Sequence, residues 1–485
     1  MDLIRHWIDN EAYAAAPERR SPVYNPATGL VRAEVALATV AEVDAAIASA
    51  AAAYPGWRDT AVTRRAKIMF KFRDLVERHM DDLAKLLTAE HGKTLDDARG
   101  EVTRGLEVIE FATGMPHLMK GEFSEQVSTG VDTYTIRQPL GVVAGITPFN
   151  FPAMVPMWMY PIAIATGNTF VLKPSEKDPS VGMLAAELLA EAGAPPGVLN
   201  VVHGDKVAVD RILEHPDVKA ISFVGSTPVA QYVYSTGTKN GKRVQALAGA
   251  KNHMIVLPDA DMELAADAAV SAGYGSAGER CMAISVVVAV GDAGDRLIPM
   301  VEERMRQLRV APGDSPGAEM SPLITKEHRD RVAGYVDAGL ESGATLVADG
   351  RGFAPEGFED GFWMGATLFD NVTPDMSIYR DEIFGPVLSV VRADSYEAAI
   401  DLINSNQWVN GTAVFTNDGG AARKFQNEIE VGMVGINVPI PVPLRFYSFR
   451  GWKDSNFGDH DLYEPEGVSF YTRGTVVIAR WPDHI

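Results

Sequence analysis

The sequence predicts an α/β protein with two domains, because strand and helix signals alternate in two separate parts of the chain. Between residues 168 and 226, apolar runs such as "NTFVLKP" alternate with helical segments such as "SVGMLAAELLAEAG". A second alternating series begins at residue 252 with "NHMIVLPDAD". This rhythm is typical of parallel sheets with helices on both faces. A chain of 485 residues is also too long for a single hydrophobic core.

The chain before residue 168 is mostly helical in pattern. Residues 22–40 predict strands joined by a turn at "NPATG", whereas residues 40–57, 63–90 and 94–115 carry apolar residues at helical spacing. Strand character returns in "YTIRQPLGVVAGITP", with a turn at "QPLG".

In the first alternating part, strands are expected at "GVLNVVHG" and "KAISFVGS" and a helix at "VAVDRILEH". In the second part, a helix at residues 262–273 precedes a strand at 283–291, and further elements continue to about residue 434. The sequence contains no internal repeat, low-complexity tract or long linker, so the two domains are expected to form one compact body.

Composition excludes several classes of function. The formal charge of −20 argues against a nucleic-acid partner, since phosphate contacts need basic surface. The N-terminus lacks the apolar core of a signal peptide, and no apolar run reaches the roughly 18 residues that cross a membrane. With one cysteine and no framework for disulfides, the chain is expected to work in a reducing compartment, the cytoplasm.

The single cysteine, Cys281, stands in "GSAGERCMAIS". A free cysteine is most often a small, inert, buried side chain, so its neighbours must decide whether it is a nucleophile. The preceding "GYGSAG" matches a dinucleotide-binding fingerprint, but that motif needs a turn from strand to helix and here follows a helix. These glycines instead predict a tight backbone turn, where nearby amides would favour the thiolate.

The asparagine in "ITPFNFP", Asn150, is open to two interpretations. A buried amide either makes structural hydrogen bonds within the loop or donates to the oxyanion of a tetrahedral intermediate on Cys281.

Polar residues also follow two predicted strands of the first series. Lys173 and Glu176 follow a strand in "FVLKPSE", and Gly225 and Ser226 follow another in "ISFVGSTP". Ligands of open α/β sheets bind at such strand ends, where ribose hydroxyls and a pyrophosphate could be held. The alternative for the charged residues is ordinary solvated surface.

The segment "RDEIFGPVLSV" contributes Glu382 and Phe384 beside a Gly-Pro turn. The carboxylate could bind a second ribose, and the ring could pack near a nicotinamide. The alternative is a plain turn before a buried strand.

In combination, "TPFNFP", "VLKPSE", "SFVGST", "GERCMA" and "EIFGPV" resemble the aldehyde dehydrogenase superfamily along essentially the whole chain. The resemblance implies that Cys281 is the nucleophile, that Asn150 is the oxyanion donor, that NAD is the cofactor and that no metal takes part. The cofactor contacts that it implies are Thr147, Phe149, Lys173, Glu176, Gly225, Ser226, Glu382 and Phe384.

The resemblance also implies an aldehyde dehydrogenase-like fold, with two doubly wound α/β domains and a small β arm. The NAD-binding domain would comprise residues 1–120 and 141–247, and the catalytic domain residues 248–455. The arm would comprise residues 121–140 and 456–485. Its exposed strand edges would pair between subunits, which predicts a homotetramer or homodimer.

Within the superfamily, "GAKNH", "RCMA" and "NVPIPVPL" resemble the coenzyme A-acylating branch, the methylmalonate-semialdehyde dehydrogenases. That branch converts malonate or methylmalonate semialdehyde to acetyl- or propionyl-coenzyme A, with reduction of NAD and loss of the carboxylate carbon. It pairs two arginines with the substrate carboxylate, which implies Arg104 and Arg280 here.

Two positions depart from this branch. Hydrolytic relatives carry a glutamate in "ELGGK" that activates water, whereas this chain reads "LAGAK" and places Leu247 there. Leucine cannot act as a base, so a thioester on the nucleophile should wait for coenzyme A. The acylating branch usually has asparagine at the position of Leu247 and proline at that of Arg445, and an added cation near the substrate mouth could alter the preferred acid.

Two rival interpretations stay open. A hydrolytic semialdehyde dehydrogenase would release a free acid, and Glu279 is a candidate base for it. A catalytically silent structural protein with this fold is the other.

Overall fold

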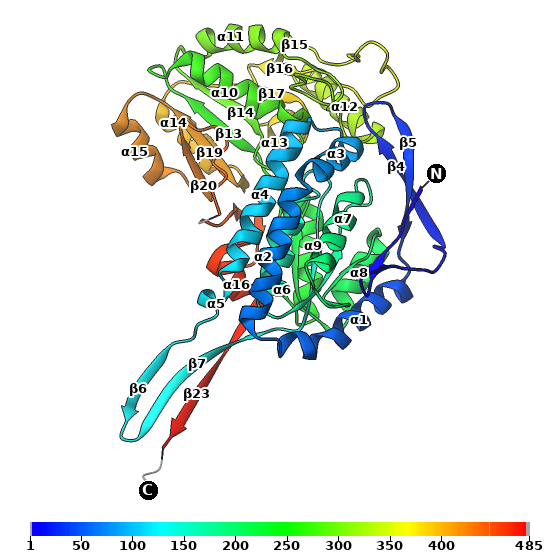
Figure 1. Ribbon diagram of the computed structural model, residues 1–485. Helices are drawn as coiled ribbons and strands as arrows, with labels where there is room; N and C mark the ends of the chain where they lie inside the picture. The colour runs from blue at the N-terminus through cyan, green and yellow to red at the C-terminus, as the bar shows by residue number, and fades with distance from the viewer. Residues whose placement is uncertain (1, 446, 482–485) are drawn as a thin grey trace.

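The computed structural model describes residues 2–445 and 447–481 and shows two α/β lobes with a long β arm (Figure 1). The first lobe is built on an eight-stranded sheet and the second lobe on a seven-stranded sheet. In Figure 1 the second lobe lies above the first, and the arm projects below both.

The sheet of the first lobe has the order β22-β12-β11-β8-β9-β10-β2-β3. Its five central strands are parallel. They are β8 (Val142–Ile146), β9 (Thr169–Lys173), β10 (Leu199–Val201), β11 (Val218–Val224) and β12 (Arg243–Leu247). The edge strands β22 (Asn456–Phe457), β2 (Trp7–Ile8) and β3 (Glu11–Ala12) are antiparallel.

Helices cover both faces of this sheet, because successive side chains of a strand point to opposite faces. Val142 and Ala144 pack in one core with α1 (Val40–Arg58), α8 (Lys206–Glu214) and α9 (Thr227–Lys239). Val143 packs in the other core, with helices that bury their apolar sides there. These are α2 (Val62–Arg78), α3 (Met80–His91), α4 (Leu95–Thr113), α5 (Met115–Leu118), α6 (Met154–Ala165) and α7 (Ser180–Glu191).

The helical pattern of residues 63–90 forms two helices rather than one. His79 ends α2 and precedes α3, and its ring nitrogen lies 3.0 Å from Asp82 Oδ2. The apolar spacing therefore continues across a break in the helical backbone at His79.

The sheet of the second lobe has the order β15-β16-β17-β14-β13-β19-β20, and only β15 (Thr345–Ala348) is antiparallel among these strands. The others are β16 (Thr367–Asp370), β17 (Val387–Ala393), β14 (Ile284–Val290), β13 (Asn252–Val256), β19 (Gly411–Phe415) and β20 (Met433–Ile436). Its helices are α10 (Met262–Tyr274), α11 (Ala293–Gln307), α12 (Lys326–Glu341), α13 (Ser377–Arg380), α14 (Tyr396–Asn404) and α15 (Gly419–Glu428). The predicted α/β class with two layered lobes is confirmed.

Two smaller sheets complete the body. One joins β1 (Asp2–Ile4), β5 (Leu30–Leu37) and β4 (Arg19–Asn25). The other pairs β18 (Trp408–Val409) with β21 (Trp452–Lys453).

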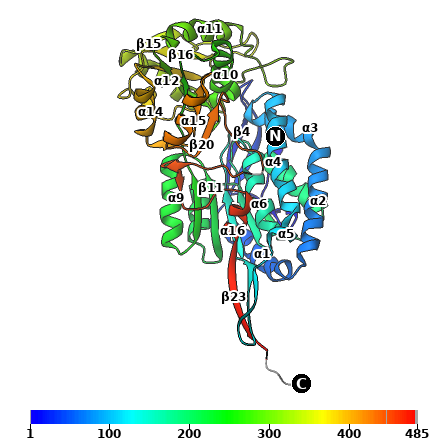
Figure 2. The same ribbon diagram turned by 90° about the vertical axis from the view of Figure 1, so that its left-hand side faces the viewer.

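The arm is a three-stranded antiparallel sheet of β6 (Phe123–Ser128), β7 (Val131–Pro139) and β23 (Thr472–Arg480). Figure 2 shows it extending away from both lobes. Within the segment 456–485, β22 pairs with β12 and α16 (Glu464–Tyr471) packs on α6, so the projecting strand begins at Thr472. The last residues of the segment, 482–485, lie outside the described part. In the described chain, no helix is long and apolar enough to span a membrane.

Candidate active site

Cys281 lies where two cavities of the body meet. The first, which we name the α4 cavity, has a volume of about 380 Å³ and is lined by α4 residues together with Cys281. The second, the α9 cavity, has a volume of about 320 Å³ and is lined by the turn before α9 together with Cys281. A reagent in either cavity would therefore reach the thiol.

The turn before Cys281 is strained. Ser276 and Ala277 have φ near 52°, and Gly278 has φ 74°, in the left-handed region that side chains avoid. A Cβ atom on Gly278 would lie 2.2 Å from the carbonyl oxygen of Gly385, so only glycine fits. The predicted tight turn is present, and it aims the next residues between the lobes.

The surroundings of the Cys281 thiol favour its neutral form. Burial, with a smaller contribution from the nearby Glu382 carboxylate, raises its pKa to about 12. The backbone amides of Cys281 and Met282 favour the thiolate, as the sequence suggested, but burial outweighs them.

Asn150 is buried on the turn between β8 and α6 and lines the α9 cavity beside Cys281. Its backbone carbonyl accepts a 2.7 Å hydrogen bond from Lys93 Nζ. Prolines at 148 and 152 keep this turn out of helical conformation, so β8 stops and α6 starts around the asparagine.

Five of the eight predicted cofactor residues line the α9 cavity: Phe149, Gly225, Ser226, Glu382 and Phe384. Ser226 precedes α9 without a capping side-chain hydrogen bond within the described residues, so the amides of Thr227 and Val229 are available to an anion, whereas Pro228 between them has no N–H. Glu382 Oε1 accepts a 2.9 Å bond from the Ala250 amide, and burial raises its pKa to about 6. Phe384, with φ 60°, packs edge-on against Phe149 at 5.8 Å.

The other three predicted cofactor residues lie together at the neighbouring strand ends. Lys173 Nζ is 3.3 Å from Glu176 Oε2, and the Thr147 amide donates to the Lys173 carbonyl at 3.1 Å. The buried hydroxyl of Thr147 has no hydrogen-bond partner among the described atoms. An unpaired buried hydroxyl is costly, which is consistent with a ligand partner here.

Sequence reasoning missed three residues of the α9 cavity: Lys177, His328 and Arg331. Lys177 Nζ lies 4.9 Å from the Phe149 ring, and Arg331 donates to the Glu382 carbonyl at 2.8 Å. Lys177 follows the "KPSE" motif directly and could have been included. His328 and Arg331 come from α12 in the other lobe, and no local pattern marks them.

The α4 cavity contains both predicted carboxylate ligands, Arg104 and Arg280, against an apolar wall. Arg280 pairs with Asp97 at 2.6 Å, and Arg104 with Glu107 at 3.3 Å. Each pair uses one terminal nitrogen, whereas a guanidinium carries five N–H donors. The wall residues are Phe151, Met154, Trp158, Met282, Ile440, Val442 and Phe449.

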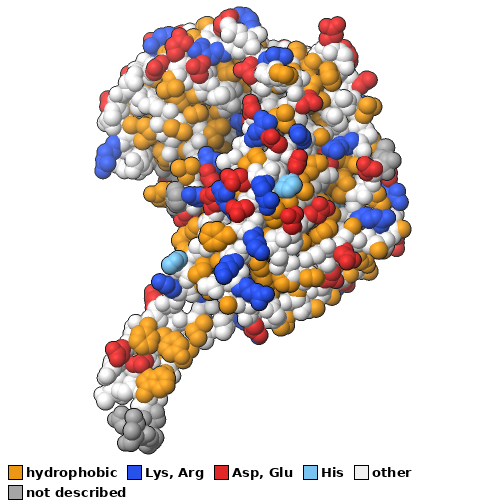
Figure 3. Space-filling view, in the orientation of Figure 1, with side chains coloured by type: hydrophobic (Ala, Val, Ile, Leu, Met, Phe, Trp, Pro, Cys, Tyr) orange, Lys and Arg blue, Asp and Glu red, His pale blue; other side chains and the backbone are white. Residues whose placement is uncertain are grey.

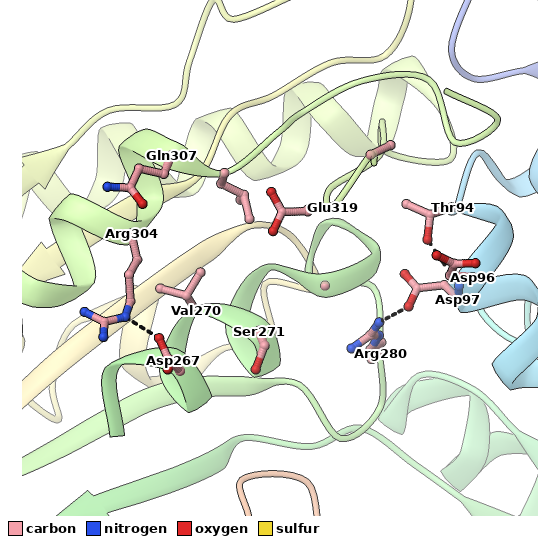
Figure 4. A pocket seen from close by; sticks show the side chains of 13 residues that line it. Thr94, Asp96, Asp97, Asp267, Val270, Ser271, Arg280, Arg304, Gln307 and Glu319 are labelled. Carbon is pink, nitrogen blue, oxygen red and sulfur yellow. Dashed lines mark hydrogen bonds and ion pairs between the residues drawn. The ribbon is translucent and has the colours of Figure 1, made fainter. Parts of the chain in front are cut away.

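The Arg280–Asp97 pair also borders a third cavity, of about 470 Å³ (Figure 4). This cavity is larger but is not lined by Cys281, and its carboxylates outnumber its arginines. Figure 4 shows the second ion pair there, between Arg304 and Asp267, far along the cavity from Arg280. Because Cys281 lines the α4 and α9 cavities and not this one, the reaction is expected in those two.

Leu247, where the hydrolytic relatives carry a glutamate, is buried at the end of β12. Glu279 is fully buried, and its Oε1 accepts from the Ile324 amide at 3.1 Å. Burial raises the Glu279 pKa to about 8, and it faces His91 and His328 at 3.8 and 3.5 Å. It is not among the residues that line the α4 or the α9 cavity.

Arg445 pairs with Glu110 on α4, so its charge is offset by a carboxylate. Among the described residues, no group of three or more histidine, cysteine or acidic side chains could hold a metal ion.

Residues 13–477 match the sequence profile of the Aldehyde dehydrogenase family. The chain belongs to this family. The resemblance seen in its motifs is confirmed, and the protein is an enzyme of the aldehyde dehydrogenase type.

Several relatives are similar along the whole chain. A malonate-semialdehyde dehydrogenase of Pseudomonas aeruginosa is 54% identical over 483 residues, covering 99% of this chain and 97% of the relative. The crystal structure of a methylmalonate-semialdehyde dehydrogenase from Oceanimonas doudoroffii is 52% identical, with a TM-score of 0.98 over 100% of this chain and 99% of that one. A Sinorhizobium meliloti structure solved in complex with NAD is 54% identical, with a TM-score of 0.99 over 100% of this chain and 99% of that one.

Proposed function

We propose that this enzyme oxidises malonate or methylmalonate semialdehyde with NAD and coenzyme A, giving acetyl- or propionyl-coenzyme A and carbon dioxide. The observation that carries the proposal is the position of Cys281 between two cavities of different chemistry. One holds two arginines suited to a carboxylate, and the other holds an open helix start with Glu382. The names of the relatives support the same substrate class.

The residues of the α9 cavity fit a dinucleotide. The open amides of α9 suit a pyrophosphate, and Glu382 and Glu176 suit ribose hydroxyls. A carboxylate at Glu176 would repel a 2′-phosphate, which favours NAD over NADP. When bound, NAD accepts the hydride that the substrate loses.

On the substrate side, Arg104 and Arg280 would hold the carboxylate, so that the aldehyde carbon faces Cys281. The Cys281 thiol gives up its proton to water, and its Sγ attacks this carbon and forms a C–S bond, while the carbonyl electron pair becomes an oxyanion that Asn150 stabilises. The oxyanion then reforms the carbonyl as the carbon gives up its hydride, which leaves a thioester on Cys281.

Two steps complete the cycle. The bond from the α-carbon to the carboxylate breaks, carbon dioxide leaves, and the electron pair passes into the thioester enolate, which takes a proton at carbon. The coenzyme A thiolate then attacks the thioester carbonyl, and the Cys281 thiolate departs.

A rapid-mixing measurement of NADH with and without coenzyme A tests this proposal. Without coenzyme A we expect a burst of about one NADH per active site and then slow turnover, because water needs a base to attack a thioester and general-base help is worth roughly 10²–10⁴-fold. Adding coenzyme A should restore steady turnover and yield an acyl-coenzyme A. Fast linear turnover with free acid as product would instead establish the hydrolytic alternative.

The burial of Glu279 away from both cavities supports the acylating form over the hydrolytic one. The chain has the nucleophile, Asn150 and the strand-end motifs together. This combination argues against a catalytically silent structural protein, because packing alone would not require it.

For the assembly, we propose a homotetramer or homodimer formed through the arm, in the cytoplasm. Exposed apolar side chains gather on the arm (Figure 3), which is unusual for a free surface. They are Phe123, Val127, Ile136, Val476, Ile478 and Trp481. Light scattering on the purified chain, compared with the double variant Val476→Glu/Ile478→Glu, would reveal the number of subunits and whether the arm joins them.

A further inference from the structure

A buried ion pair lies directly behind the turn that carries Asn150. Lys93 Nζ is 2.6 Å from Glu101 Oε2, and the two side chains are 1% and 0% exposed. Burying two charges costs desolvation energy, and replacing such a pair with apolar residues is often neutral or stabilising. Stability alone is therefore a weak reason for this pair to exist.

Each partner makes further hydrogen bonds, and all of them go to the same turn. Lys93 Nζ donates to the Asn150 carbonyl at 2.7 Å and lies 4.5 Å from the Phe151 ring. Glu101 Oε1 accepts from the amides of Ala153 and Met154 at 2.7 and 3.1 Å.

The bonds to Glu101 replace a cap for α6. Ala153 precedes this helix and makes no side-chain capping bond within the described residues, so its first amides need an acceptor from elsewhere. A carboxylate is also the charge that a helix start prefers. The pair thus fixes the turn at both ends, at the carbonyl of residue 150 and at the amides of residues 153 and 154.

The same face of α4 also contributes other charged side chains to the α4 cavity. Asp97, Glu101 and Arg104 are spaced i, i+4 and i+7, which places them on one side of a helix. Asp97 bonds Arg280 next to the nucleophile, and Arg104 lines the cavity. The Leu95 amide donates to the Gly313 carbonyl of the second lobe, so the start of α4 is tied to the lobe that carries Cys281.

We propose that Lys93 and Glu101 are positioning residues that hold the Asn150 carboxamide where the oxyanion forms, with no part in the bond changes themselves. The inference rests on the role of Asn150 in the proposed function. It assigns to α4 the alignment of the oxyanion donor with the nucleophile of the other lobe.

A double-mutant cycle tests the inference, read out as the rate of the NADH burst with propanal, which needs neither coenzyme A nor a carboxylate. Glu101→Gln keeps the shape but removes the charge, and we expect the burst to slow about 10–100-fold, since removing an oxyanion donor itself costs about 10²–10³-fold. In an Asn150→Ala background, Glu101→Gln should slow the burst no further. The burst is measured at saturating NAD, because the same turn carries Phe149 of the α9 cavity.

Asp81→Asn is the matched control. Asp81, on α3, is one of two exposed carboxylates that pair with Arg99 of α4, and the burst of the variant should stay at the rate of the unmodified enzyme. If Glu101→Gln fails to fold, Lys93→Met/Glu101→Leu replaces the whole pair with apolar side chains and should show the same slow burst.

Three results would overturn the inference. If Glu101→Gln slows the burst by the same factor in the unmodified and the Asn150→Ala backgrounds, the pair acts on stability or on another part of the site and not through Asn150. An unimpaired burst in the folded Lys93→Met/Glu101→Leu variant means that the pair is dispensable. If the unmodified protein forms no NADH with any aldehyde, the proposed function falls as well, whereas the first two results leave it intact.

Discussion

The two cavities that meet at Cys281 are built in different ways. The α9 cavity is formed by turns at strand ends, and several of its residues come in short runs of sequence such as 148–150 and 224–226. The α4 cavity is formed by helices and a late loop, and its residues are scattered from Lys93 to Phe449. The α9 cavity offers backbone amides at the start of α9, whereas Lys93, Arg104 and Arg280 of the α4 cavity each form an ion pair with a carboxylate of α4.

This difference indicates a division of labour. Open amides at a helix start bind any pyrophosphate, so the α9 side can serve a common cofactor. Side chains held in ion pairs keep fixed positions. A fixed binding group discriminates between substrates, because a substrate whose polar group lies elsewhere leaves a buried group without a hydrogen bond. Substitutions should therefore separate: those of the two arginines on the α4 side should change substrate preference, and those on the α9 side should change cofactor use or thiol reactivity.

The largest separation is expected for Arg104→Leu. The loss of one charge-assisted contact to the carboxylate should lower kcat/KM for malonate semialdehyde by about 10–100-fold, since such bonds contribute about 1.5–3 kcal/mol. Propanal, which has no carboxylate, should lose less than about threefold. Steady-state kinetics on both aldehydes checks this, and a similar loss for both would make Arg104 a structural residue.

Leu247→Glu should convert the enzyme toward hydrolysis. A carboxylate at the end of β12 would supply the missing base and raise the coenzyme A-independent release of free acid by about 10–100-fold. Product analysis without coenzyme A is the measurement, and Leu247→Gln, which is polar but not basic, is the control. Equal gains in both variants would show that polarity rather than base catalysis promotes hydrolysis.

On the α9 side, Glu382→Gln should make Cys281 more reactive in the absence of NAD. The Glu382 carboxylate raises the pKa of the thiol, so its removal lowers that pKa and increases the thiolate fraction at a given pH. In the unmodified enzyme, where this pKa is raised to about 12, alkylation by iodoacetamide should rise about tenfold per pH unit from pH 7 to 10 without a plateau. At pH 8 the variant should react about three to ten times faster. A slower reaction would mean that Glu382 assists deprotonation instead.

The smallest effect is expected for Arg445→Ala. Its partner Glu110 offsets its charge, and half-exposed ion pairs contribute about 0–1 kcal/mol. The KM for semialdehydes should rise by no more than about fivefold, with no change in the preference between malonate and methylmalonate semialdehyde. Lys424→Ala, in the exposed pair with Glu397, controls for the loss of a surface cation. A reversed preference would show that Arg445 reaches the substrate after all.

Much of the architecture and the α9 side could be predicted from the sequence. Strand-and-helix alternation is a local signal, because the chain itself sets the period of its apolar residues. The motifs around Asn150 and Gly225 are local too, since each follows the end of a strand that the same stretch of sequence forms, and the motif around Glu382 directly precedes the strand β17. The strained turn before Cys281 was marked by its glycines, and Gly278 is indeed a position where a side chain would collide.

What only the tertiary structure decided is which distant residues meet and what their charges do there. A lysine after α3, a glutamate on α4 and an asparagine after β8 become one hydrogen-bonded unit only when the helices pack, and their spacing in the sequence gives no sign of it. The pKa of Cys281 was likewise misjudged from local amides, because burial by surrounding elements is a property of the whole fold. Arg445 is a further case, because only packing shows that the Glu110 carboxylate lies beside its guanidinium. The sequence alone determined the chemistry that is available, because residue types and strand ends are local. The tertiary structure determined its arrangement and its protonation, because distances and desolvation depend on every element that packs around the site.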